Sequence, residues 1–171
     1  MIHIYYGDGK GKTTAAVGLA ARAAGSRMKV LFVQFLKTEF SGERHTLSHT
    51  ENITLTFAPM ELKFTYDMNE AEKSKAAVMF RKIFDDAVTK VLTQKYDMIV
   101  LDEIFSAIEA GMVNEHDVYE FVSNAPKNLE VVLTGHNPSP KILELADYIT
   151  EMKKIKHPFD NGVQARFGIE F

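Results

Sequence analysis

The sequence predicts an α/β fold of three layers, with a mostly parallel, doubly wound sheet between helices, because three patterns agree. Short apolar runs alternate with helical segments along the 171 residues, which is typical of parallel sheets with right-handed crossovers. The run 28–35 (MKVLFVQF) is apolar almost without interruption, as expected of a strand covered on both faces. Segment 69–95 has apolar residues at spacings of three and four, which predicts a long amphipathic helix.

The remaining strands and helices are predicted from the same kinds of sequence pattern. The expected strands are short and rich in β-branched or aromatic residues, and lie at 2–6, 28–35, 53–57, 97–101, 129–135 and 148–152. The expected helices are alanine-rich or amphipathic, and lie at 13–24, from 41 onward, at 69–95, around 104–110 and 115–124, and at 138–146. Gly25 ends the first helix, residues 59–68 have no clear period and predict a loop, and the tail after residue 152 is predicted to form a C-terminal hairpin.

The composition is that of an ordinary globular chain, with 46% hydrophobic and 25% charged residues. Its net charge of −3 gives no indication of nucleic acid or an anionic membrane as a partner. The absence of cysteine excludes disulfides, thiolate metal sites and a cysteine nucleophile. We find no secretory signal and no run near the roughly 18 apolar residues of a membrane span. We therefore expect one domain, 1–171, in the cytoplasm.

The segment YYGDGKGKTT (5–14) lies between a predicted strand and a predicted helix, and it is close to the phosphate-loop pattern G-x-x-x-x-G-K-[ST]. The first glycine is one position late, because Tyr6 stands where the pattern has glycine. Backbone amides of such a loop and the helix N-terminus bind phosphate, while the lysine reaches phosphate oxygens and the threonine hydroxyl binds Mg²⁺. The candidate ATP-binding residues are Gly7, Asp8, Gly9, Lys10, Gly11, Lys12, Thr13 and Thr14.

A second motif, MIVLDE (98–103), is an apolar strand that ends in Asp102 and Glu103. By itself this pair could be a strand-end turn or a helix cap. With the glycine loop it predicts a Mg²⁺–nucleotide site, in which Thr13, Asp102 and Glu103 hold the metal. No N-K-x-D guanine motif is present, so ATP is the expected nucleotide. These residues alone do not distinguish a kinase from an ATPase.

Several segments together resemble a known family: GDGKGKTTAAVGLAARAAG (7–25), VQFLK (33–37), SGE (41–43), KFTYD (63–67), IVLDEI (99–104), VVLTG (131–135), LELADYITEM (143–152) and IKHPFDNGVQARFGIEF (155–171). In this order they are similar to the ATP:corrinoid adenosyltransferases of the cobalamin-biosynthetic type. The resemblance covers nearly the whole chain. It implies a RecA-like P-loop NTPase fold, Mg²⁺, and transfer of the 5′-deoxyadenosyl group of ATP to cobalt(I) of a corrinoid, with release of triphosphate.

The resemblance also implies how the site works. ATP lies reversed relative to kinases, so that the loop holds triphosphate as a leaving group while cobalt attacks C5′. Lys12, Thr13 and Glu103 are the expected catalytic residues, and the acceptor is cob(I)alamin or cob(I)yrinic acid a,c-diamide. The implied partners are a flavoprotein-type reductant and a second copy in a homodimer.

Two positions depart from the family pattern. Phe64 and Tyr66 match the segment thought to displace the lower axial ligand of the corrinoid, but Tyr66 replaces the usual tryptophan. His136 stands where arginine is common, and it is a candidate contact to the corrinoid or triphosphate. Two other functions stay open: a small-molecule kinase, which would release ADP, and a non-catalytic, nucleotide-gated corrinoid-binding module.

Overall fold

The computed structural model describes residues 1–36, 41–58 and 68–170. Its centre is a six-stranded sheet with the strand order β3-β2-β4-β5-β1-β6, in which every pair is parallel. The strands are β1 (Ile2–Tyr6), β2 (Val30–Gln34), β3 (Ile53–Phe57), β4 (Met98–Asp102), β5 (Glu130–Gly135) and β6 (Tyr148–Glu151). The predicted α/β class and parallel sheet are therefore confirmed.

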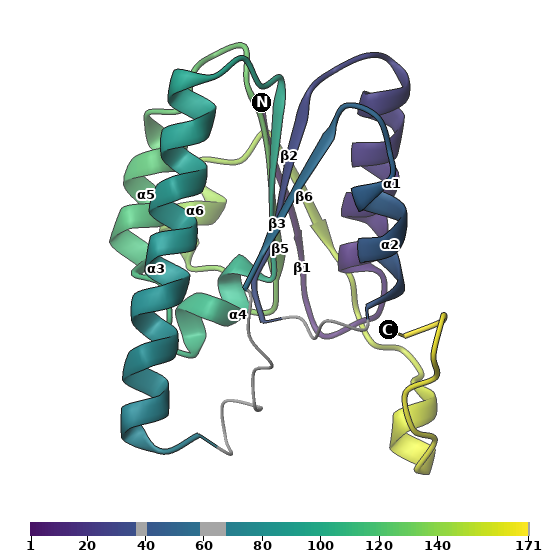
Figure 1. The fold of residues 1–171 in the computed structure, drawn as a ribbon. Helices are drawn as coiled ribbons and strands as arrows, with labels where there is room; N and C mark the ends of the chain where they lie inside the picture. The colour runs from purple at the N-terminus through teal and green to yellow at the C-terminus, as the bar shows by residue number, and fades with distance from the viewer. Residues whose placement is uncertain (37–40, 59–67, 171) are drawn as a thin grey trace.

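Helices cover both faces of the sheet, as Figure 1 shows, with α1 and α2 on one side and α3 and α5 on the other. The helices are α1 (Lys12–Gly25), α2 (Gly42–Ser48), α3 (Glu70–Thr93), α4 (Ile104–Glu109), α5 (Glu115–Ser123) and α6 (Pro140–Leu143). Within the described residues, no helix is both long and apolar enough to cross a bilayer.

The continuous apolar runs form strands because side chains alternate between two buried layers. Val30 and Phe32 of β2 pack with the alanines of α1, whereas Leu31 and Val33 pack in the layer that contains Phe80 of α3. Small alanines let α1 lie close to the sheet. The long helix α3 begins at a capping box, in which the Asn69 side chain accepts from the Glu72 amide.

The predicted C-terminal hairpin is wrong, because the described residues after β6 contain no strand. Instead, Pro158 begins a short 3₁₀ helix, η2 (Pro158–Asn161), that ends at Gly162 with a φ of 77°. Proline fixes φ and lacks the amide that a strand ladder needs. Ion pairs within the tail, such as Lys154–Asp160 at 2.9 Å, also favour a local fold over strand pairing.

The helix predicted at 138–146 is present but short. Ser139, which precedes Pro140, is extended with a ψ of 155°, because a residue before proline is disfavoured in the α region. The helix ends at Leu143, and the Asp147 amide already donates to the Ile2 carbonyl at the start of β1. The chain therefore leaves the helix early to place β6 beside β1.

Candidate nucleotide site

The glycine loop connects the carboxyl end of β1 to the N-terminus of α1, as predicted. Gly7 and Gly11 have φ values of 113° and 121°, which disfavour any residue with a Cβ. Gly11 is the N-cap of α1, so Lys12 occupies the first helical position. The Lys12 side chain is buried, and its Nζ donates to the Gly9 carbonyl at 2.9 Å. The ammonium group is thus held over the loop, where an anion would meet the helix N-terminus.

The loop packs directly against the backbone that follows β6. A Cβ on Gly9 would lie 2.6 Å from the Met152 carbonyl oxygen, and a Cβ on Gly7 would lie 2.5 Å from the same atom. The Gly9 amide donates to this oxygen at 2.7 Å, and the Met152 amide donates to the Tyr6 carbonyl at 2.7 Å. These glycines therefore allow close packing between the loop and the backbone that follows β6.

Thr13 and Asp102 are brought together, as the two motifs predict. The Thr13 hydroxyl donates to Asp102 Oδ1 at 3.0 Å, and the carboxylate is fully buried. Thr134 Oγ1 also donates to Oδ1 at 2.8 Å, and Gln34 Nε2 lies 3.3 Å from Oδ2. A hydroxyl beside a carboxylate suits Mg²⁺, which takes one or two protein carboxylates and completes its shell with water and phosphate oxygens. Among the described residues, no group of three or more metal-binding side chains is found.

Glu103 follows Asp102 in the left-handed region of backbone conformation. It has a φ of 61° and forms the N-cap of α4, while its amide donates to Thr134 Oγ1 at 2.8 Å. Its carboxylate accepts from the Ser106 hydroxyl at 2.5 Å, and the same hydroxyl oxygen lies 3.1 Å from His136 Nδ1. Thr134 therefore links the Glu103 amide to the Asp102 carboxylate, while Ser106 connects the Glu103 carboxylate to His136.

His136 follows β5 and lies next to the glycine loop. Its carbonyl accepts from the Gly7 amide at 3.2 Å, and its side chain is exposed. Gly135 is the last residue of β5. Only glycine fits there without a shift, because a Cβ at this position would lie 2.6 Å from the Cβ of Phe105. The loops after β1, β4 and β5 therefore lie together at the carboxyl ends of the strands.

The C-terminal tail (residues 152–170) also contacts the loop through charged groups. The Asp8 carboxylate accepts from the Lys154 amide at 2.9 Å, and this hydrogen bond lowers the pKa of Asp8. Lys10 Nζ lies 3.3 Å from Glu170 Oε1, and hydrogen bonds from Arg166 hold the pKa of Glu170 at about 2. Residues 168–170, the first turns of α1 and the start of α2 enclose a cavity of about 280 Å³.

Sequence reasoning missed two buried or central polar residues of this site. Gln34 is fully buried, lies 3.2 Å from Glu43 Oε1 through its Nε2, and accepts from Arg44 Nε at 3.0 Å. The sequence offered one signal for Gln34, because it is the only polar side chain in the apolar strand β2 and stands at its end. The sequence offered no signal for Ser106, because its contact with His136 depends on where β5 lies in the fold. Phe64 and Tyr66 lie outside the described residues.

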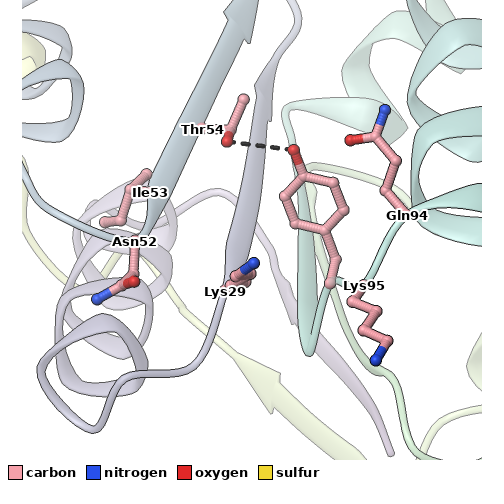
Figure 2. Close-up of a pocket in the computed structure, with 7 residues that line it drawn as sticks. Lys29, Asn52, Ile53, Thr54, Gln94 and Lys95 are labelled. Atoms are coloured by element: carbon pink, nitrogen blue, oxygen red, sulfur yellow. Dashed lines mark hydrogen bonds between the residues drawn. The ribbon is translucent and has the colours of Figure 1, made fainter.

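A second cavity is lined by Lys29, Asn52, Ile53, Thr54, Gln94, Lys95 and Tyr96 and is drawn in Figure 2. The Tyr96 hydroxyl donates to Thr54 Oγ1 at 3.2 Å across it. Lys29 precedes β2 and Tyr96 precedes β4, so this cavity lies at the amino ends of the strands. It is at the opposite edge of the sheet from the nucleotide site.

Comparison with known proteins agrees with this geometry. The chain is 36% identical over 172 residues to the corrinoid adenosyltransferase of Escherichia coli (strain K12), covering 100% of this chain and 85% of that protein. It is 35% identical, with the same coverage, to the corrinoid adenosyltransferase CobA of Salmonella typhimurium. It is 32% identical to the corrinoid adenosyltransferase of a Sinorhizobium species, covering 100% of this chain and 80% of that protein. The family model described as ATP:corrinoid adenosyltransferase BtuR/CobO/CobP matches residues 1–171, and the chain belongs to this family.

Proposed function

We propose that this protein transfers the 5′-deoxyadenosyl group of ATP to the cobalt of a reduced corrinoid and releases triphosphate. The electron pair of cobalt(I) forms a bond to C5′, the bond from C5′ to oxygen breaks, and its electrons leave with the triphosphate. The observation that carries the proposal is the contact between Thr13 and the buried Asp102 beside a glycine loop, in a chain of this family.

The chemistry needs no nucleophile from the protein, because the reduced cobalt supplies it. The protein's task is to stabilise negative charge on the leaving triphosphate. Lys12, held over the loop by the Gly9 carbonyl, and the first amides of α1 are the groups for this task. Lys10, a loop residue that is paired with Glu170, is a second candidate for this task. We also propose that ATP lies reversed relative to kinases, with C5′ turned outward.

The residues present suit a magnesium ion. The Thr13 hydroxyl and the Asp102 carboxylate form a donor set of the expected kind, and Glu103 stays a predicted ligand. When bound there, Mg²⁺ would supply charge neutralisation for the triphosphate.

The corrinoid side of the site is a prediction. Phe64 and Tyr66 are the proposed contacts to the lower face of the corrinoid, and His136 is a proposed contact near its edge. Cob(I)alamin and cob(I)yrinic acid a,c-diamide are the candidate acceptors. A flavoprotein-type reductant and a homodimer stay predictions from the family resemblance.

Anaerobic incubation with ATP, Mg²⁺ and a chemically reduced corrinoid tests the function directly. We expect a light-sensitive adenosylated product in the absorbance spectrum and one triphosphate for each product formed. Release of ADP with a phosphorylated acceptor would support a kinase instead. Binding of both ligands without a carbon–cobalt bond would support a binding module.

A further inference from the structure

Three side chains from two elements form a short hydrogen-bonded chain at the carboxyl edge of the sheet. Ser106, in α4, donates its hydroxyl to Glu103 Oε2 at 2.5 Å. The Ser106 oxygen also lies 3.1 Å from His136 Nδ1. The two contacts fix the hydroxyl group between a carboxylate and an imidazole.

The distances decide which group donates in each contact. A separation of 2.5 Å is typical of a hydroxyl that donates to a carboxylate oxygen, and a serine has only one hydroxyl proton. Since that proton is directed to Glu103, the Ser106 oxygen can only accept from His136. Nδ1 must then carry a proton, and in the neutral imidazole Nε2 is left with a lone pair.

His136 is placed where such a lone pair can meet a ligand. Its side chain is exposed, and its carbonyl accepts from the Gly7 amide of the glycine loop at 3.2 Å. The part of the chain that the structure describes offers Nε2 no hydrogen-bond partner. An acceptor at this position lies next to the loop that would hold ATP.

We infer that Ser106 is a positioning residue that fixes His136 in the Nδ1–H tautomer, so that Nε2 recognises N–H donors on the edge of the corrinoid. This inference rests on the proposed function and names a preference within it. A corrin ring carries amide or carboxylate side chains around its edge. An amide N–H can donate to Nε2, whereas a carboxylate is acceptor-only and is repelled by the lone pair. His136 therefore favours a fully amidated corrinoid over one with free carboxylates.

The tautomer can be measured without any substrate. At about pH 9, where free histidine is neutral, two-dimensional ¹H–¹⁵N spectra of the ring nitrogens distinguish the two tautomers. The chain contains references for both: the Phe159 amide donates to His157 Nδ1 at 3.2 Å, which requires the Nε2–H form, and His49 Nδ1 lies 2.8 Å from the His45 carbonyl, which requires the Nδ1–H form. We expect His136 to match His49, and a signal that matches His157 would overturn the inference.

Two variants of Ser106 test the positioning role. Ser106→Ala removes the hydroxyl oxygen that accepts from Nδ1–H, so we expect the His136 signal to change to a mixture of tautomers. Ser106→Thr keeps a hydroxyl and should keep the wild-type signal. An unchanged spectrum in Ser106→Ala would show that Ser106 does not set the tautomer.

The specificity is tested by kinetics with two acceptors, a fully amidated corrinoid and one with several free carboxylates. We expect wild-type KM to favour the amidated acceptor, and His136→Ala to reduce the ratio of the two KM values by about three- to tenfold. Asn137→Ala is the matched control, because Asn137 is the exposed neighbour and its side chain donates to Glu109. A ratio unchanged in His136→Ala would refute the specificity role. If no corrinoid is adenosylated at all, the proposed function and the specificity both fail, while the spectra still decide the tautomer.

Discussion

Gly9→Ala is the substitution for which the structure gives the clearest physical expectation. The added Cβ would lie 2.6 Å from the Met152 carbonyl oxygen and 2.8 Å from two further backbone carbon atoms, of Met152 and Lys153. No side-chain rotation can relieve contacts with backbone, so either the loop or the segment after β6 must move. That movement also weakens the hydrogen bond from the Gly9 amide to the Met152 carbonyl, which is 2.7 Å long.

The size of the effect follows from known costs of overpacking. Forcing an extra methyl group into a packed region costs about 1 to 3 kcal/mol, and a chain of this length loses about 2 to 4 °C of Tm for each kcal/mol. We therefore expect Gly9→Ala to lower Tm by roughly 2 to 12 °C. Because the displaced loop is also the proposed phosphate site, KM for ATP should rise as well.

Gly18→Ala supplies a control of opposite sign. Gly18 lies inside α1, and a Cβ there meets nothing within 4 Å, so alanine should stabilise the helix by about 0.5 to 1 kcal/mol. Both variants are compared with wild type by thermal and urea unfolding, and by initial rates at varied ATP. A Gly9→Ala protein as stable as wild type, with Gly18→Ala stabilised as expected, would refute the close packing of the loop on Met152.

Three further predictions concern charge and capping. Lys12→Ala should lower kcat/KM for ATP by about 10²- to 10³-fold with little change in unfolding, and equal kinetics would exclude Lys12 from triphosphate stabilisation. Hydrogen bonds from Arg166 hold the pKa of Glu170 at about 2, below its ordinary value of 4.5, so the contribution of Glu170 to stability is present above about pH 4.5 and is lost as the pH falls toward 2. Carboxyl NMR titration should show this low midpoint and its return toward 4.5 in Arg166→Gln. Asn69→Ala removes the acceptor for the Glu72 amide and should cost about 1 kcal/mol of unfolding free energy without changing KM for ATP, whereas unchanged unfolding would mean that the cap contributes nothing.

Much of the fold could be predicted because local pattern and tertiary role agree. β2 is buried on both faces, so its continuous apolar sequence was enough to predict a strand without knowledge of its neighbours. The end of β4 at Asp102 was also predictable, because a charged residue after four apolar ones marks the edge of the sheet. Thr13 and Asp102 then meet as a consequence of parallel strands sharing one edge.

The features that could not be predicted depend on contacts between distant segments. Ser106 is an ordinary serine of α4 until β5 brings His136 beside it. The tail was predicted to form a hairpin, whereas local pairs such as Arg166 with Glu170, and the contact of Glu170 with Lys10, stabilise a different fold. The left-handed backbone of Glu103 and the hydrogen bond between its carboxylate and Ser106 could not be predicted from the motif.

The packing of Met152 on the glycine loop has a consequence for synthesis on the ribosome. β1 is made before the other five strands of the sheet, yet it pairs with β5 and β6, which are made after the other four. The glycine loop likewise obtains its backbone support only when Met152 has been made. Such long-range pairing makes closure a late event in folding. A nascent chain that has already exposed its glycine loop is therefore still unable to hold the loop in its final shape until Met152 has been made.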